Sequence, residues 1–135
     1  MSPQFGTAGP NPIIIPLLRM AFLLGAAFLG GVVGIVRWQV EASLPLETAT
    51  PLASTGRILW GIAIAGCVFI AARVRRERDR AKVLSQSIVG WAIAESVAIF
   101  GAVYWFLSGV SQWYFAGLGF LAFALLAIPG VRRQA

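Results

Sequence analysis

The sequence predicts an all-α integral membrane protein, a four-helix transmembrane bundle with both termini in the cytoplasm. Two observations predict this class. Of the 135 residues, 59% are hydrophobic and 12% are charged, whereas a soluble domain carries about 25% charged residues. The hydrophobic residues also gather in runs close to the length of helix that crosses a bilayer, about 20 residues. We therefore expect one membrane domain that begins at residue 17.

Four apolar segments make up this domain. They lie at about 17–38, 57–72, 87–107 and 113–128. Residues 1–16 contain four prolines and no basic n-region, so we expect an extended tail there rather than a cleavable signal peptide.

Turn and breaker residues predict how the segments are joined. Pro45 and Pro51 should prevent a continuous helix before the second segment, which leaves Ser54 or Thr55 as its N-cap. The link between the last two segments is only "SGVSQ". Such a short link requires antiparallel neighbouring helices. Pro129 with Gly130 should end the last helix.

Basic residues predict the orientation. The loop expected at 73–86 holds most of them: Arg73, Arg75, Arg76, Arg78, Arg80 and Lys82. Because Lys and Arg stay on the cytoplasmic side, this loop and both termini should lie inside. The loop directly abuts a span, so we expect it to contact anionic lipid headgroups, at about 1 kcal/mol per residue, and not nucleic acid.

Aromatic residues agree with this orientation. Those near the outer ends of the spans are Trp38, Trp60, Tyr104, Trp105, Trp113 and Tyr114. Their position is typical of an interfacial belt.

Small residues recur every four positions in three segments, and the row in the second segment is Ala63, Cys67 and Ala71. The row in the first segment is Ala26, Gly30 and Gly34, and that in the third is Gly90, Ala94, Ala98 and Ala102. Rows of this kind let two helix backbones approach closely. We expect them to mediate helix packing, either within the bundle or against another protein.

Glu95 is the residue that most suggests a specific function. It lies in the apolar stretch "IVGWAIAESVAIFGAVYWF", about 10 Å inside the hydrocarbon if the span begins near residue 88. We expect it to face neighbouring helices. An acid at this depth is either a structural group, neutral or paired with Arg19, or one that carries a proton, an ion or a substrate.

Other chemistry finds little support in the sequence. The chain has one cysteine, Cys67, and no histidine, so it has no metal-binding set and no His ligand for haem or chlorophyll. No nucleophile and base are paired in a motif, and we expect no enzyme and no cofactor of its own.

Two stretches resemble known families. "AIAESVAIFGAV" (92–103) resembles the carboxylate-bearing helix of rotary ATPase proteolipid c subunits, which implies that Glu95 carries an ion. Residues 57–131 are similar to a loose group of bacterial four-span membrane proteins that share a basic loop, an Ala-x-x-Glu helix and a short outer turn. That likeness implies a fold and no activity.

The function expected from these features is an accessory subunit of a larger complex in the bacterial inner membrane, such as a photosynthetic or respiratory assembly. Its partners would be other integral membrane subunits and anionic lipids, and contacts with lipid or carotenoid-type pigment are compatible with it. The alternative is a small proton- or ion-coupled transporter that uses Glu95.

The predicted orientation can be tested by cysteine labelling of intact cells. In a Cys67→Ser background, a membrane-impermeant maleimide should modify Thr48→Cys and spare Asp79→Cys. The reverse pattern would disprove the topology.

Overall fold

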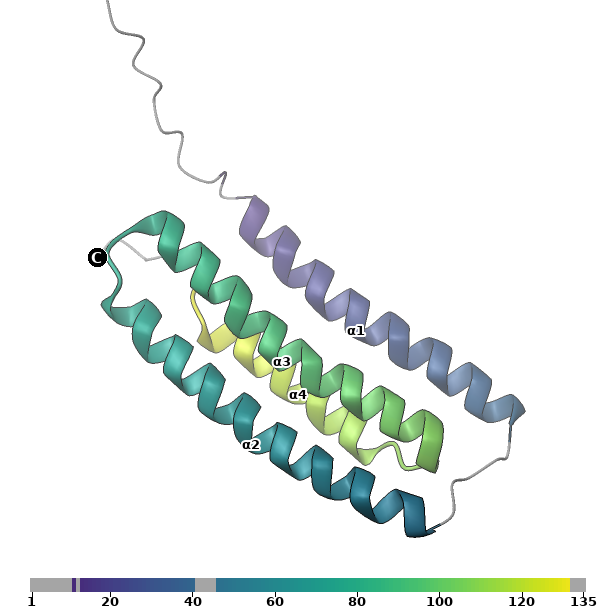
Figure 1. The fold of residues 1–135 in the computed structure, drawn as a ribbon. Coiled ribbons are helices and arrows are strands. Elements are labelled where there is room, and N and C mark those ends of the chain that lie inside the picture. The colour runs from purple at the N-terminus through teal and green to yellow at the C-terminus, as the bar shows by residue number, and fades with distance from the viewer. Residues whose placement is uncertain (1–10, 12, 41–45, 132–135) are drawn as a thin grey trace, which may run out of the picture.

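The computed structural model describes residues 11, 13–40 and 46–131 and, for 46–49, the backbone alone. These residues form four helices: α1 (Ile14–Gln39), α2 (Leu46–Arg76), α3 (Arg80–Ser108) and α4 (Gln112–Ala127). Successive helices run in opposite directions along one bundle (Figure 1). The described residues include no strand, which confirms the all-α class.

Three helices are long and apolar enough to cross a membrane. They are α1 with 26 residues, α2 from Thr50 to Arg76 with 27, and α3 with 29. Helix α4 has 16 residues, or about 24 Å, against a hydrocarbon core of about 30 Å. The structure thus supports a membrane helix bundle, while the fourth span stays a prediction.

Helix α3 lies at the centre of the bundle and contacts each of the other three helices. Its closest neighbour is α4. A Cβ atom on Gly117 would lie 2.8 Å from Cα of Ala98, and one on Gly101 would lie 2.6 Å from the carbonyl oxygen of Trp113. Backbones at this separation exclude any side chain at the two glycines. Ala94, Ala98 and Ala102 are fully buried along the same side of α3.

The predicted row of small residues in α1 packs this helix against α3 and α4. The Tyr114 hydroxyl donates to the carbonyl oxygen of Ala26 at 2.9 Å. Gly30 lies beneath the Tyr114 ring, and a Cβ on Gly34 would lie 3.3 Å from Trp105. In the row on α3, Gly90 faces Ile70 of α2 and Ile128. The rows on α1 and α3 therefore serve packing within this chain.

Two predicted helix starts are wrong. Helix α1 begins at Ile14, within the tail expected to be extended, and takes in Pro16. Its first turn tolerates this proline because N–H groups there have no partner inside the helix. Helix α2 begins at Leu46 and includes Pro51, which likewise lies near the start, where few backbone bonds are lost. Pro45 lies outside the described residues.

The early start of α2 also overturns the predicted N-cap. Ser54 and Thr55 lie inside the helix, and their hydroxyls donate to the carbonyl oxygens of Thr50 and Pro51. Both side chains therefore bond to the backbone of the preceding turn and do not cap the helix.

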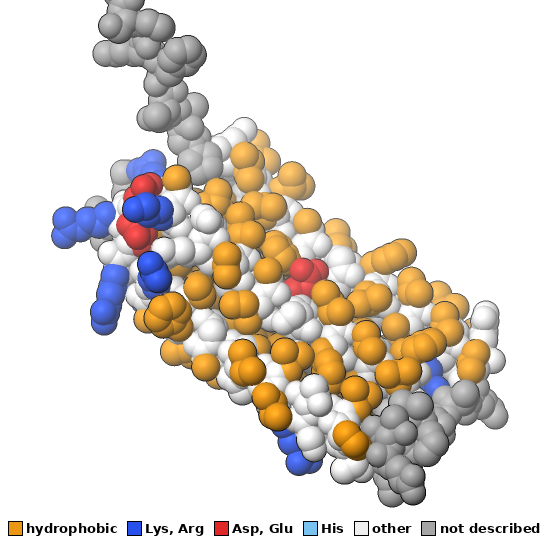
Figure 2. Space-filling view, in the orientation of Figure 1, with side chains coloured by type: hydrophobic (Ala, Val, Ile, Leu, Met, Phe, Trp, Pro, Cys, Tyr) orange, Lys and Arg blue, Asp and Glu red, His pale blue; other side chains and the backbone are white. Residues whose placement is uncertain are grey.

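The basic loop predicted at 73–86 is almost wholly helical. Only residues 77–79 separate α2 from α3. The Glu77 carboxylate accepts from the N–H groups of Arg78 and Asp79, and Asp79 caps α3 by accepting from the N–H of Ala81 at 3.0 Å. This tight turn gathers charged side chains at one end of a surface that is otherwise largely hydrophobic (Figure 2).

The short link between the last two helices behaves as predicted. Gly109 ends α3 in the left-handed conformation with φ 79°, and its N–H bonds to the carbonyl oxygen of Trp105. A glycine is needed there because other residues rarely adopt this conformation. Helices α3 and α4 are antiparallel neighbours (Figure 1), and α4 ends at Ala127, before Pro129.

The predicted aromatic belt divides into two groups. Trp38 is 89% exposed, whereas Tyr104 and Tyr114 are buried between helices. Trp113 joins them to α2, with ring centres 6.2 Å from Tyr104 and 6.5 Å from Trp60. These rings therefore pack the end of the bundle opposite the charged turn, and their place at a membrane interface stays a prediction.

The glycine contact between α3 and α4 predicts a sharp difference within one helix. Gly117→Leu should destabilise the protein by about 1–3 kcal/mol, because the added carbons meet the backbone of α3. Gly119→Leu is the matched control, since a Cβ there meets nothing within 4 Å. Unfolding in mixed micelles, followed by circular dichroism, measures both. Equal effects would contradict the close approach.

Candidate functional site

One side of α3 is left uncovered by the other helices. Helix α4 packs behind α3, while α1 and α2 lie along its two flanks (Figure 1). On the α1 side, a Cβ on Gly25 would lie 3.5 Å from the Glu95 carboxyl group, and on the α2 side a Cβ on Gly66 would lie 3.4 Å from Ile93. Between these flanks the exposed residues of α3 include Ser85 and the apolar Val89, Ala92, Ile99, Val103 and Phe106. We call this surface, with the adjoining edges of α1 and α2, the open face.

Glu95 lies at the α1 edge of the open face. Its Oε1 atom would be 3.5 Å from a Cβ on Gly25, and its side chain is partly exposed. It stands about 22 Å from the start of α3 and about 20 Å from its end. The carboxyl group is thus deep along the helix and reaches the surface, instead of facing only neighbouring helices as the sequence predicts.

The carboxyl group of Glu95 has no partner in the part of the chain that the structure describes. No hydrogen bond or ion pair reaches it there. The neighbouring Ser96 does not donate a hydrogen bond to this carboxyl group, because its hydroxyl donates to the carbonyl oxygen of Ile93 at 2.6 Å. In hydrocarbon an unpaired carboxylate is costly, so this group is the least satisfied feature of the open face.

Arg19, the partner that the sequence offers to Glu95, is engaged elsewhere. Its guanidinium lies over the Trp91 ring, with Cζ 5.4 Å from the ring centre. One terminal nitrogen donates to the carbonyl oxygen of Ile128 at 3.4 Å. Arg19 lies about 9 Å below Gly25 along α1. The ion pair between Glu95 and Arg19 is therefore not formed in this structure.

Small residues surround the carboxyl group. Gly25 is exposed on α1, and Ala92 is exposed one turn below Glu95 on α3. They leave room for another helix backbone to approach the acid. Gly25 is not among the small residues predicted from the sequence, although it directly precedes the row that begins at Ala26.

Other candidate groups add no reactive centre. Cys67 is buried, and its thiol donates to the carbonyl oxygen of Gly90 at 3.5 Å. Within the described ranges, no three residues among His, Cys, Asp and Glu come together as metal ligands do. The basic side chains at the α2–α3 turn lie at the end of the bundle, remote from Glu95.

Comparison of the chain with protein-family models, with curated proteins and with solved structures finds no match. The case for a function therefore depends on the geometry of Glu95 and the open face.

The lack of a partner for Glu95 predicts a mild effect of its removal. Glu95→Gln should change the stability of the isolated protein by less than about 0.5 kcal/mol, because no hydrogen bond or ion pair is lost. Tyr114→Phe is the control, because it removes the buried bond to Ala26 and should cost about 1 kcal/mol.

Both variants can be compared by unfolding in mixed micelles. A loss of several kcal/mol for Glu95→Gln would show that the carboxylate is paired with a cation in the isolated chain.

Proposed function

We propose that this protein is a non-catalytic accessory subunit of a larger membrane complex, and that it docks through the open face. One observation carries the proposal: near the middle of α3, Glu95 presents at the helix surface a carboxyl group that no described residue pairs with. Lipid offers such a group no hydrogen bond, whereas a neighbouring subunit can.

The energetics favour a partner helix with a matching polar group. An ionised side chain at the centre of a membrane helix costs about 2.5–3.5 kcal/mol on insertion scales. A basic or hydrogen-bond-donating side chain at the same depth would offset much of this cost. Gly25 and Ala92 would let the partner backbone come close enough for dispersion contacts to add to the pairing.

The shape of the bundle supports the same proposal. Helices α1 and α2 flank α3, so a further helix laid on α3 would contact all three. Most of the exposed side chains on this surface are aliphatic or aromatic, such as Val103 and Phe106. Their chemistry suits a transmembrane segment.

The class of the parent complex is inferred from the sequence features and not from the site. We propose a bacterial inner-membrane assembly of the energy-converting kind, photosynthetic or respiratory. In that setting the chain would cross the membrane four times, with both termini and the charged turn in the cytoplasm. It would fill space, orient lipid or pigment and aid assembly of its neighbours.

Docking through the open face can be tested by purifying the tagged protein from its native membrane in mild detergent. Ala92→Trp and Glu95→Gln should each lower the amount of co-purified membrane partner about tenfold, because one blocks the face and the other removes its charge. Ala116→Trp is the matched control, since Ala116 is exposed on α4, away from this face.

Equal losses in all three variants, or none in any, would contradict docking through this face. Deleting the protein should leave the parent complex smaller or less abundant, while its chemistry survives in what remains.

A second function, transport of a proton or ion by Glu95, is favoured by the same outward position. A carboxyl group at the surface of a bundle can be reached by another subunit that supplies and removes its ion. Loss of ion flux in Glu95→Gln vesicles, with the bundle and its assembly intact, would favour the transporter. Unchanged flux with lost assembly would favour the accessory subunit.

A further inference from the structure

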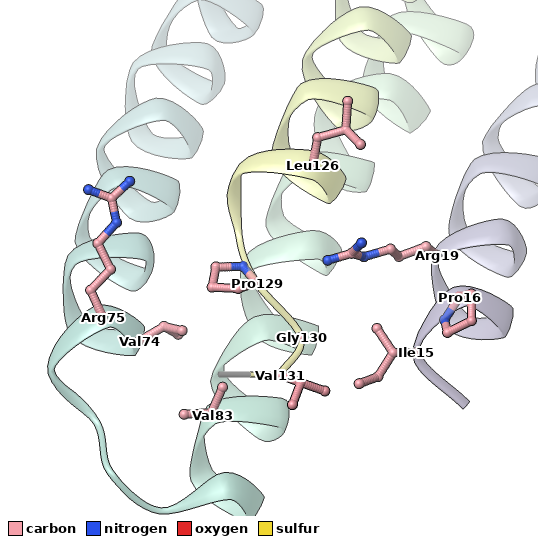
Figure 3. A pocket seen from close by; sticks show the side chains of 10 residues that line it. All are labelled: Ile15, Pro16, Arg19, Val74, Arg75, Val83, Leu126, Pro129, Gly130 and Val131. Atoms are coloured by element: carbon pink, nitrogen blue, oxygen red, sulfur yellow. The ribbon is translucent and has the colours of Figure 1, made fainter. Parts of the chain in front are cut away.

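A cavity of about 830 Å³ lies at the charged end of the bundle, where α1, the end of α2, the start of α3 and the segment after α4 meet. Most of its wall is apolar, including Ile15, Val83 and Leu126. Two arginines interrupt this wall, Arg19 from α1 and Arg75 from α2. Figure 3 shows Arg19 reaching from α1 toward Pro129 at the end of α4, with Arg75 on the far side of that proline.

The guanidinium of Arg19 is poorly satisfied by the protein. It carries five N–H donors, yet the described residues accept only one hydrogen bond from it, to Ile128 at a long 3.4 Å. Its Nε atom is buried and has no hydrogen-bond partner among the described residues. No carboxylate in the described ranges pairs with it. Arg19 lines the cavity, so an anion there would meet the N–H groups of its terminal nitrogens that Ile128 does not use.

Arg19 stacks on a ring that is itself tightly packed. Trp91 is fully buried beneath it, and the edge of Phe22 contacts the Trp91 ring at 6.2 Å between ring centres. Gly130 packs directly against the Trp91 ring, because a Cβ there would lie 2.9 Å from that ring. The guanidinium rests on this ring and donates to Ile128, and these two contacts lower the entropy that it loses on binding a ligand.

The depth of the cavity matches a lipid headgroup. Arg19 lies about 8 Å from the start of α1, near the boundary between headgroups and hydrocarbon. Further Lys and Arg side chains gather at this end of the bundle (Figure 2). Basic residues at this level attract anionic headgroups.

We propose that this cavity binds a phosphate group, that of an anionic phospholipid, on the Arg19 guanidinium. The planar guanidinium donates two parallel hydrogen bonds to phosphate oxygens. The glycerol and first acyl carbons then lie against apolar walls such as Leu126, and Arg75 contributes a second positive charge at the rim. A free phosphate ion would find the same donor but would leave the apolar walls without a ligand. This site is independent of Glu95 and of the open face.

Native mass spectrometry of the full-length protein in detergent can test the site with phosphatidylglycerol as the probe. Diacylglycerol with the same acyl chains, which lacks the phosphate, is the reference lipid. Arg19→Gln should weaken retention of phosphatidylglycerol about tenfold and leave diacylglycerol unchanged. Arg80→Gln is the matched control, because it removes one exposed positive charge at the same end without lining the cavity.

A second variant guards against misfolding of Arg19→Gln. Val131→Trp places a large ring in the cavity while it keeps Arg19, and it should also weaken retention of phosphatidylglycerol, with unchanged circular dichroism. Equal losses for Arg19→Gln and Arg80→Gln, or no loss for Arg19→Gln, would overturn the site.

Inorganic phosphate distinguishes the two sources of the phosphate group. If the ligand is a lipid, millimolar phosphate should leave bound phosphatidylglycerol in place. Displacement by phosphate would overturn the assignment to a lipid and would give the site to a free anion.

Discussion

The close approach of α3 and α4 is the constraint on which the rest of the structure depends. Gly101 and Gly117 bring the two backbones together, and neither position has space for a Cβ atom. This contact puts the small side chains of α3 against α4, so α3 becomes the centre of the bundle. Helices α1 and α2 can then pack only on its flanks, and the open face is the side that remains.

Hydrogen bonds at the two ends of α4 hold this arrangement in register. Near its start, the Tyr114 hydroxyl donates to Ala26 of α1. Beyond its end, the Ser87 hydroxyl of α3 lies 2.7 Å from the carbonyl oxygens of both Val83 and Pro129. The bonds to Ala26 and Pro129 each join segments far apart in the sequence, and they are buried and partly buried respectively. Because hydrogen bonds are directional, they fix the position of one helix along another, which contacts between apolar surfaces alone do not.

Arg19 and Glu95, two of the charged groups on the helices, point to different partners because packing separates them. Arg19 is drawn down onto Trp91 at the charged end, where its free donors suit a phosphate group. Glu95 remains higher on the open face beside Gly25, with no partner in the described chain. An ion pair between them would have neutralised both charges, and neither group would then need a partner from outside the chain. Their separation is the reason why we look for a lipid at one and a protein at the other.

The sequence by itself determined the class of the protein, the approximate positions of its apolar helices, the antiparallel pair formed across "SGVSQ" and the end of α4 before Pro129. These features follow from local composition and from the residues that break helices. It also identified Glu95, since a single acid in an apolar run is visible without any structure. It misplaced the starts of α1 and α2, because a proline in or near a first turn costs few backbone bonds and does not exclude a helix. Only the tertiary structure decided that Glu95 reaches the surface, that Arg19 stacks on Trp91 and that Tyr114 is buried. Those outcomes depend on the rotation of each helix about its axis, which is set by contacts such as that of Gly117 with Ala98 between residues distant in sequence.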